Sequence, residues 1–196
     1  MPTRKPNGLE KRKARFRQLD DKWYDEVYST DTSPGYWPGW DIVLGWLSPE
    51  DRLADFGCGH GQFDEYLVNH GYNLVYGADY SAVAIDLAKK RLPAHADKFN
   101  QLDLRNGSAF KFNGYDVALF METLEHVPDD LAVLSYVPSG KRVIITLPSF
   151  DYTSHYRHFN SLDECEARYK LSIQIKRKTE VLDSRSIKFW LLDAVR

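Results

Sequence analysis

The stretch LADFGCGHG, residues 53–61, decides the fold of this chain. A mostly apolar run leads into three glycines at alternate positions, Gly57, Gly59 and Gly61, and the helical pattern FDEYLVNHG (63–71) follows. Glycine allows tight turns, and it lets the backbone approach a ligand without interference from a Cβ atom. The pattern therefore predicts a strand, a ligand-binding glycine turn and a helix.

Strand and helix patterns continue to alternate after this stretch. A strand pattern in NLVYGAD (73–79) precedes a helix pattern in SAVAIDLAKKRL (81–92), for which Ser81 is the expected N-cap. Further strand patterns are KFNQLDL (98–104), YDVALFM (115–121) and KRVIITL (141–147), and the helix pattern LEHVPDDLAVLSYV (124–137) follows the second of these. Such alternation requires crossover connections, which produce a parallel sheet covered on both faces. The sequence predicts a doubly wound α/β domain.

The two ends of the chain differ from this alternating core. At the carboxyl end, residues 171–183 and 185–195 are strand patterns separated by a short turn, which predicts an antiparallel hairpin at one end of the sheet. At the amino end, residues 1–17 hold seven Lys or Arg and one Glu. We expect residues 1–48 to form a basic arm with aromatic-rich helices or a lid, and residues 49–196 to form the ligand-binding domain.

Length and composition exclude several classes of protein. The chain has 196 residues, of which 43% are hydrophobic, and a net charge of −2, as expected for one globular domain. No stretch approaches the ~20 consecutive apolar residues of a membrane-spanning helix, and the basic opening lacks the apolar core of a secretory signal. Cys58 and Cys165 are too few for a disulfide framework. We expect a cytoplasmic protein with reduced thiols and no membrane association, and the sequence predicts no particular oligomeric state.

An acid beside the glycine turn indicates the charge of the ligand. Asp55 lies two residues before Gly57, and the spacing GxGxG differs from the GxGxxG of dinucleotide-binding folds, whose helix amides face a pyrophosphate. A carboxylate beside a pyrophosphate is unfavourable, whereas beside an ammonium or sulfonium it is favourable by ~1 kcal/mol or more. The loop therefore suits a nucleoside that carries positive charge.

Two further acids follow the next strands, where ligands of an open parallel sheet bind. Asp79 lies 22 residues after Gly57, at the place where an acid accepts hydrogen bonds from ribose hydroxyls. Asp103 can accept a hydrogen bond from an exocyclic adenine amine, and Tyr80 and Leu104 can flank the ring. Any one of these acids alone is more commonly a solvated strand-end residue, but their order along the chain favours a nucleoside site.

Four motifs in order resemble those of the class I S-adenosylmethionine-dependent methyltransferases: DFGCGHG (55–61), GADYS (77–81), QLDL (101–104) and DVALFMETLEHVPDD (116–130). The resemblance is to the small-molecule branch, which includes the ubiquinone-biosynthesis O-methyltransferases. It implies a Rossmann-like, mostly parallel seven-stranded sheet whose last strand is antiparallel. It also implies methyl transfer from S-adenosylmethionine to a small-molecule acceptor.

The resemblance further implies the cofactor-binding residues. Asp55, Gly57, Gly59 and Gly61 would surround the methionine part of S-adenosylmethionine, Asp79 would hold the ribose, and Asp103 would contact the adenine. Met121 and Glu122 would line the cofactor pocket. Residues 49–196 would then form the S-adenosylmethionine-binding methyltransferase domain.

Methyl transfer from a sulfonium is an in-line displacement, in which the enzyme chiefly holds the acceptor atom ~3 Å from the methyl group. A hydroxyl acceptor also benefits from a proton acceptor, and His126, just beyond the strand pattern 115–121, is the leading candidate. Glu122, His155 and His158 are the other candidate catalytic residues. The alternative is that His126 only hydrogen-bonds the loop around it.

Aromatic residues before the glycine stretch are candidates for the acceptor pocket, namely Tyr24, Tyr28, Tyr36, Trp37 and Trp40. Prolines and glycines interrupt this segment, which predicts short helices around a loop. The alternative is that these side chains pack an N-terminal helix onto the domain, since aromatic rings bury large areas wherever they lie.

Two other functions compete with small-molecule methylation. Glu122, Glu125 and His126 form the pattern ExxEH, which resembles that of the small-RNA 3′-terminal 2′-O-methyltransferases, and a downstream His would complete a metal site. The basic arm could neutralise phosphates, but the rest of the chain carries more acidic than basic side chains. We therefore expect no metal and rank a nucleic-acid acceptor second. A protein that binds S-adenosylmethionine without methylating is the third hypothesis.

Overall fold

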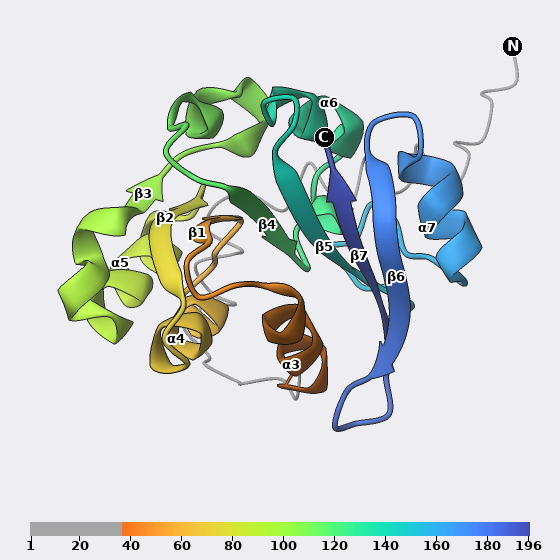
Figure 1. Ribbon diagram of the computed structural model, residues 1–196, viewed down its shortest axis with the longest axis horizontal. Helices are drawn as coiled ribbons and strands as arrows, with labels where there is room; N and C mark the ends of the chain where they lie inside the picture. The colour runs from red at the N-terminus through yellow and green to blue at the C-terminus, as the bar shows by residue number, and fades with distance from the viewer. Residues whose placement is uncertain (1–36) are drawn as a thin grey trace, which may run out of the picture.

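The computed structural model describes residues 37–196, which contain one seven-stranded sheet in the order β3-β2-β1-β4-β5-β7-β6 (Figure 1). The strands are β1 (Arg52–Phe56), β2 (Asn73–Asp79), β3 (Phe99–Gln101), β4 (Val117–Met121), β5 (Arg142–Pro148), β6 (Gln174–Leu182) and β7 (Lys188–Val195). Strands β1 to β5 pair in parallel, whereas β7 is antiparallel to both β5 and β6. The predicted parallel sheet with a carboxyl-terminal antiparallel hairpin is confirmed.

Helices cover both faces of this sheet. The α-helices are α3 (Trp37–Trp46), α4 (Gln62–Asn69), α5 (Ala82–Arg91), α6 (Asp130–Tyr136) and α7 (Leu162–Tyr169). Apolar side chains of α3 and α4 pack with Leu53 and Leu119 on one face, and those of α6 and α7 pack with Phe56 and Phe120 on the other. Burial on both faces explains the nearly continuous apolar runs of the central strands. The fold is therefore the predicted doubly wound α/β architecture.

Local signals explain where several elements begin. The Ser81 side chain caps α5 by accepting a hydrogen bond from the Ala84 amide at 3.1 Å, as predicted. The helix expected over residues 124–137 is wrong in extent, because a 3-10 turn (Leu124–His126) and α6 replace it. Pro128 disfavours helical geometry at the residue before it, and Val127 is extended. This break leaves Glu125 and His126 on a short turn rather than on a regular helix.

The third strand is shorter than the sequence predicts. Strand β3 ends at Gln101, and Asp103 instead caps a 3-10 turn (Leu104–Asn106), where its side chain accepts a hydrogen bond from the Arg105 amide. Two other 3-10 helices, Pro93–Lys98 and Ser108–Lys111, connect the elements around this strand. Asp103 therefore lies beyond the carboxyl end of β3, on the edge of the sheet where Asp79 also lies.

Two smaller expectations concern the cysteines and membrane-spanning helices. Cys58 and Cys165 are both buried, free thiols, as expected. Within residues 37–196, no helix combines the length and the apolar character needed to cross a membrane.

Candidate cofactor and acceptor site

The glycine turn after β1 adopts a conformation that only glycine takes easily. Gly57, Gly59 and Gly61 have φ angles of +91°, +52° and +76°. A Cβ atom on Gly57 would lie 2.3 Å from Cγ2 of Thr123, which is closer than two atoms can approach. The amides of Gly57 and Cys58 donate to the carbonyl oxygen of Ala78 on β2, at 2.7 and 3.1 Å. The turn is therefore fixed against both β2 and the segment after β4.

Asp79, the last residue of β2, joins this turn to the start of α5. Its carboxylate accepts hydrogen bonds from the Gly59 amide at 3.0 Å and from the Ser81 amide at 2.9 Å. The side chain is buried, and this burial raises the pKa of Asp79 to about 6. Each carboxylate oxygen has a second lone pair that can accept from a ligand hydroxyl. The role of Asp79 as the ribose-binding acid stays a prediction.

A second buried acid faces β1, and sequence reasoning missed it. Asp55 at the end of β1 and Asp64 in the first turn of α4 are 1% and 0% exposed. Burial raises the pKa of Asp55 to about 8, and burial together with the charge of Asp55 raises the pKa of Asp64 well above its usual value. A signal was present, because Asp64 shares the buried helix face with Phe63 and Leu67.

The predicted adenine-binding residues lie at the ends of β2 and β3. Leu104 is buried and Tyr80 is half-buried. Burial alone would raise the pKa of Asp103, but its hydrogen bonds with Arg105 hold that pKa below its usual value. The Asp103–Arg105 ion pair was not predicted. It means that any ligand contact of Asp103 is made by a carboxylate already held in place by Arg105.

The residue after β4, Glu122, is strained and buried. Its φ angle is +52°, a conformation that costs energy for any residue other than glycine. Its amide donates to Oγ1 of Thr146 on β5 at 2.8 Å, and its Oε1 has no hydrogen-bond partner among residues 37–196. Burial raises the pKa of Glu122 to about 8. Such strain together with a buried carboxyl whose pKa is raised is typical of functional sites.

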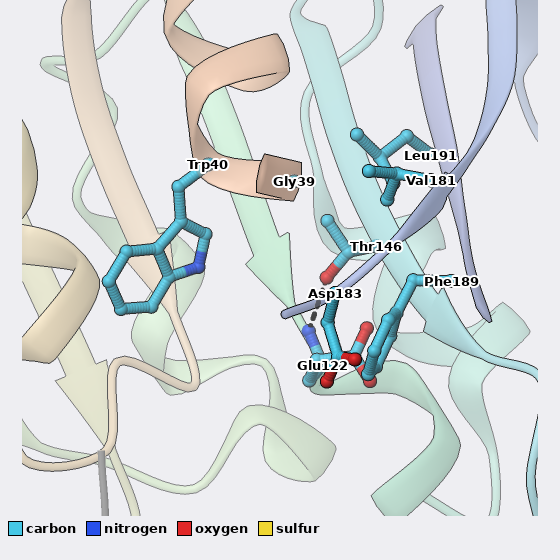
Figure 2. A pocket seen from close by; sticks show the side chains of 8 residues that line it. All are labelled: Gly39, Trp40, Glu122, Thr146, Val181, Asp183, Phe189 and Leu191. Atoms are coloured by element: carbon cyan, nitrogen blue, oxygen red, sulfur yellow. Dashed lines mark hydrogen bonds between the residues drawn. The ribbon is translucent and has the colours of Figure 1, made fainter. Parts of the chain in front are cut away.

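Glu122 lies at one end of a pocket between α3 and the β5–β7–β6 part of the sheet (Figure 2). The lining residues are Gly39, Trp40, Glu122, Thr146, Val181, Asp183, Phe189 and Leu191. The cavity volume among them is about 20 Å³, enough for about one water molecule, and the pocket is partly open to solvent. Its walls are mostly apolar.

Trp40 is the one predicted acceptor-pocket residue whose side chain is described. It lines the pocket, and its ring centroid also lies 5.4 Å from that of Phe63 and 5.3 Å from that of Tyr66. Both interpretations of Trp40, pocket wall and packing residue, thus have a contact that supports them. Tyr24, Tyr28 and Tyr36 lie outside the described residues, as does the basic arm, and Trp37 begins α3 but its side chain is not described.

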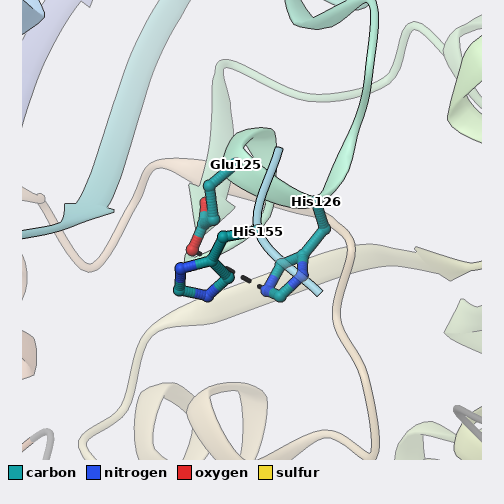
Figure 3. A group of neighbouring side chains, drawn as sticks. All are labelled: Glu125, His126 and His155. Atoms are coloured by element: carbon teal, nitrogen blue, oxygen red, sulfur yellow. Dashed lines mark ion pairs between the residues drawn. The ribbon is translucent and has the colours of Figure 1, made fainter. Parts of the chain in front are cut away.

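A second group of polar residues consists of Glu125, His126 and His155 (Figure 3). One ligand atom from each lies within 4.8 Å of the others. Nδ1 of His126 is 3.2 Å from the Ser154 carbonyl and Nδ1 of His155 is 3.1 Å from the Phe150 carbonyl, so both rings donate through Nδ1 and carry the lone pair of the neutral form on Nε2. Burial and the nearby His155 lower the pKa of His126.

This group contains the donor atoms that a divalent cation would use, two imidazole nitrogens and a carboxylate. Glu125 is fully buried, and neither of its carboxyl oxygens has a hydrogen-bond partner among the described residues. Glu122 is not a member of this three-residue group. His158 also lies apart from it, with Nδ1 3.9 Å from Oδ1 of Asp151. The ExxEH pattern thus brings together only part of the set that it predicts.

Arg157 holds the turn that carries Glu125 and His126. Its guanidinium donates to the carbonyl oxygens of Leu124, Val127 and Pro128, and it lies 3.4 Å from the buried carboxylate of Asp130. A single arginine that satisfies three carbonyls of one turn is a strong positional restraint. Sequence reasoning missed this residue because its partners lie about 30 positions away along the chain.

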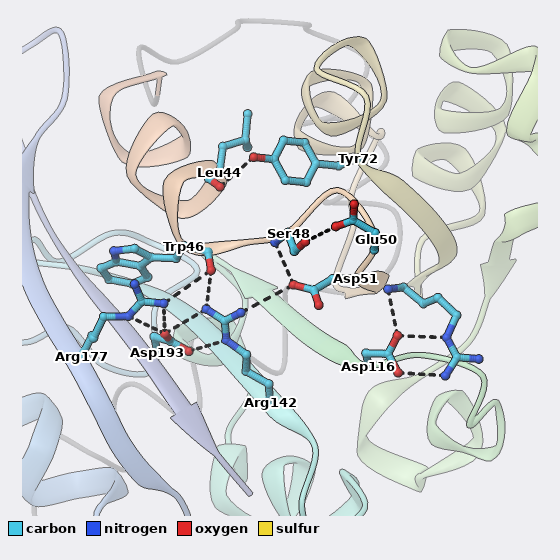
Figure 4. Close-up of polar contacts among 11 residues, drawn as sticks. Leu44, Trp46, Ser48, Glu50, Asp51, Tyr72, Asp116, Arg142, Arg177 and Asp193 are labelled. Atoms are coloured by element: carbon cyan, nitrogen blue, oxygen red, sulfur yellow. Dashed lines mark hydrogen bonds and ion pairs between the residues drawn. The ribbon is translucent and has the colours of Figure 1, made fainter.

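A polar network fixes the other end of α3 against the sheet (Figure 4). Arg142 on β5 and Arg177 on β6 both donate to the buried Asp193 on β7 at 2.8 Å. Both also donate to the carbonyl oxygen of Trp46, the last residue of α3, at 2.6 and 3.4 Å. Charge-assisted hydrogen bonds, above all those of arginine to a carboxylate, are strong and directional. The network therefore fixes α3, whose first turns carry Gly39 and Trp40.

Part of the chain is similar to known methyltransferases. The family described as Methyltransferase domain (Methyltransf_12) matches residues 54–138. The ubiquinone biosynthesis O-methyltransferase of Nitrosomonas europaea is 33% identical over 138 residues, which cover 66% of this chain and 55% of that protein. The corresponding enzyme of Nitrosospira multiformis is 31% identical over 127 residues, covering 61% and 52% of the two chains. The chain spans about half the length of these curated relatives.

Solved structures of low sequence identity share the fold. The 1,6-didemethyltoxoflavin-N1-methyltransferase of Burkholderia thailandensis aligns with a TM-score of 0.71 at 16% identity, covering 100% of this chain and 93% of that one. The methyltransferase domain of bacterial CtHen1 aligns with a TM-score of 0.63 at 19% identity, covering 81% and 97%. Residues 54–138 thus match a methyltransferase family model, and the chain shares the fold of these solved methyltransferase structures.

Proposed function

We propose that this protein is an S-adenosylmethionine-dependent methyltransferase that methylates a small-molecule acceptor. The observation that carries the proposal is the position of Asp79 and the glycine turn. Both lie at the carboxyl ends of β1 and β2, next to the point between β1 and β4 where the strand order reverses. Ligands of open α/β sheets bind at this point. The curated relatives named above support the same function.

The described residues fit this cofactor. Asp55 and Asp64 present buried carboxyl oxygens without hydrogen-bond partners among residues 37–196, and a cation such as an ammonium or sulfonium would stabilise them. Asp79 can accept from the ribose hydroxyls, and Asp103 with Leu104 can contact the adenine, as the motifs imply. When bound, the sulfonium supplies the methyl group. The protein residues bind it, orient the acceptor and exclude water.

The acceptor is proposed to bind in the pocket beside Glu122. Trp40, Val181, Phe189 and Leu191 supply apolar walls, and the Glu122 carboxyl lies at one end. This combination suits an acceptor with an apolar body and one hydroxyl or amine directed at Glu122. Tyr24, Tyr28, Tyr36 and Trp37 remain proposed acceptor-binding residues from the sequence.

Glu122 is the better proposed proton acceptor for a hydroxyl. A catalytic base works best when its pKa lies near the working pH. The pKa of Glu122 is raised to about 8, whereas that of His126 is lowered. His126, His155 and His158 therefore become secondary candidates.

Changing Glu122 to Gln is expected to lower kcat by about 100-fold, because general base catalysis contributes at least that factor. The affinity for S-adenosylhomocysteine should change by less than about threefold, since Gln keeps the shape of the side chain. In the unmodified protein kcat should rise with pH and level off above about 8, because only the ionised carboxylate accepts a proton. Initial rates across pH 6 to 10 measure this.

His126→Ala is the comparison variant for this experiment. It should lower kcat less and keep the same pH profile, with cofactor affinity nearly unchanged. If the rise of kcat with pH persisted in Glu122→Gln and disappeared in His126→Ala, His126 rather than Glu122 would be the proton acceptor. Loss of cofactor binding in His126→Ala would indicate a structural role for His126.

Product analysis tests the reaction itself. We would incubate the protein with S-adenosylmethionine and small phenols, acids and amines, and then with RNA ends. Methyl transfer yields S-adenosylhomocysteine together with a methylated acceptor, whereas a cofactor-cleaving enzyme yields no methylated product and a sensor consumes no cofactor. Activity that survives exhaustive chelation would exclude a metal at Glu125, His126 and His155. The cytoplasm is the proposed location, because the free thiols Cys58 and Cys165 suit a reducing compartment.

A further inference from the structure

Two buried acids, Asp55 at the end of β1 and Asp64 in the first turn of α4, lie beneath the glycine turn. Asp55 is on the face of β1 that carries Leu53, and Leu53 packs with Phe63 and Leu67 of α4. Asp64 lies on the buried face of α4 with the same two side chains. Asp55 and Asp64 are 1% and 0% exposed. The acid pair therefore lies between β1 and α4, under the loop.

No described hydrogen bond satisfies the pair. Oδ1 of Asp55 and both carboxyl oxygens of Asp64 lack a hydrogen-bond partner among residues 37–196. Two carboxylates buried in one apolar cluster are unfavourable when both are ionised and no cation is near. A proton on one of them removes one charge. The free protein is therefore expected to keep a proton on the pair.

The charged and titratable groups around Asp55 and Asp64 favour the protonated form of the pair. Asp79 on β2 adds negative charge, and the Cys58 thiol in the loop is a further titratable neighbour. Arg91, where α5 meets α4, pairs with Glu65 at 2.9 Å. Tyr66 of α4 donates its hydroxyl to Asp41 of α3. β4, which pairs with β1 on its other side, presents Leu119 opposite Asp55 and adds no charge there.

We infer that the buried pair of Asp55 and Asp64 keeps a proton in the free protein, and that the pair gives up this proton when the ammonium group of the cofactor's methionine end binds beside it. This inference rests on the proposed function. The charge balance is simple: one carboxyl O–H bond breaks, the proton leaves to buffer, and the ammonium replaces it as the positive group. Asp64 thereby becomes a positioning residue for the cofactor and makes its binding dependent on pH.

The direction of the pH dependence follows from the proton release. Below the pKa of the pair, each unit of pH increase should strengthen S-adenosylhomocysteine binding by up to tenfold, because one proton must leave for each ligand bound. The gain should stop once the pair is already ionised in the free protein. A ligand without the ammonium, 5′-methylthioadenosine, should bind with the same affinity above pH 7, where Asp79 is already mostly ionised.

The test is calorimetric titration of the full chain with S-adenosylhomocysteine at pH 7, in phosphate and in Tris. The two buffers take up protons with different enthalpies, so the difference in heat counts the protons released. At pH 7 Asp79 is already mostly ionised and contributes little. We expect release of half to one proton by the unmodified protein, and none with 5′-methylthioadenosine.

Asp64→Asn is the decisive variant, and the exposed Asp86→Asn on α5 is its matched control. Asp64→Asn should fold at least as stably, because it removes an unpaired buried acid, and its proton release should fall to near zero. Asp86→Asn should behave as the unmodified protein. If Asp64→Asn failed to fold, the pH series on the unmodified protein would decide instead.

Three results would overturn the inference. The first is binding of S-adenosylhomocysteine without proton release, and the second is unchanged release in Asp64→Asn; both would leave the proposed function standing. The third is absence of binding by both S-adenosylhomocysteine and 5′-methylthioadenosine, which would overturn the proposed function as well.

Discussion

Gly57→Ala is expected to destabilise the protein by about 3 kcal/mol and to abolish cofactor binding. The φ angle of +91° costs an alanine about 1–2 kcal/mol. The new Cβ atom would also lie 2.3 Å from Cγ2 and 2.5 Å from Oγ1 of Thr123, and relieving such overlap costs about 1–3 kcal/mol. Thr123 follows the strained Glu122, so moving it disturbs the acceptor side too.

Gly71→Ala provides a matched control for this variant. Gly71 has a similar φ angle of +81°, but no atom lies within 4 Å of the position its Cβ would take. The Gly71→Ala variant should therefore lose only the stability that the positive φ angle costs an alanine, and it should keep its cofactor affinity. Urea unfolding followed by circular dichroism measures both variants. Equal stability of Gly57→Ala and Gly71→Ala would show that the close approach of Thr123 is unimportant.

Asp79→Ala is expected to weaken binding of S-adenosylhomocysteine by about 100-fold or more. The change removes the acceptor for the proposed ribose contact, and a hydrogen bond to a charged group contributes about 1.5–3 kcal/mol. It also leaves the amides of Gly59 and Ser81 without their acceptor, which loosens the loop. Asp79→Asn keeps one carbonyl oxygen and should lose less affinity.

The controls separate binding from folding. Asp86→Ala removes an exposed acid from the adjacent helix and should change neither affinity nor stability. Thermal melting of each variant shows how much of it is folded at the titration temperature. Unchanged affinity in a folded Asp79→Ala variant would remove Asp79 from the cofactor site.

The sequence predicts most of the fold because its local patterns and its topology agree. The glycine turn, the alternation of strands and helices, the Ser81 cap and the terminal hairpin are each encoded within about ten residues. The predicted extent of the helix after β4 is wrong because Pro128 holds Val127 in an extended conformation and interrupts the helical pattern. That error matters, because it concerns the turn that carries Glu125 and His126.

The candidate site could be predicted only in part. Asp55, Asp79 and the three glycines are neighbours in space because parallel strands end at one edge of the sheet, which follows from topology. The burial of Asp64, the restraint by Arg157 and the closeness of His126 to His155 depend on packing between distant segments. Periodicity along one segment does not contain that information. The roles of these residues in binding and catalysis stay predictions.

The central claim is that the glycine turn and Asp79 form a binding site for S-adenosylmethionine, and calorimetric titration of the purified chain tests it most directly. The account predicts saturable, single-site binding of both S-adenosylmethionine and S-adenosylhomocysteine, with Kd values in the micromolar range, equivalent to about −7 to −8 kcal/mol. Absence of saturable binding by either ligand to the folded protein would contradict it.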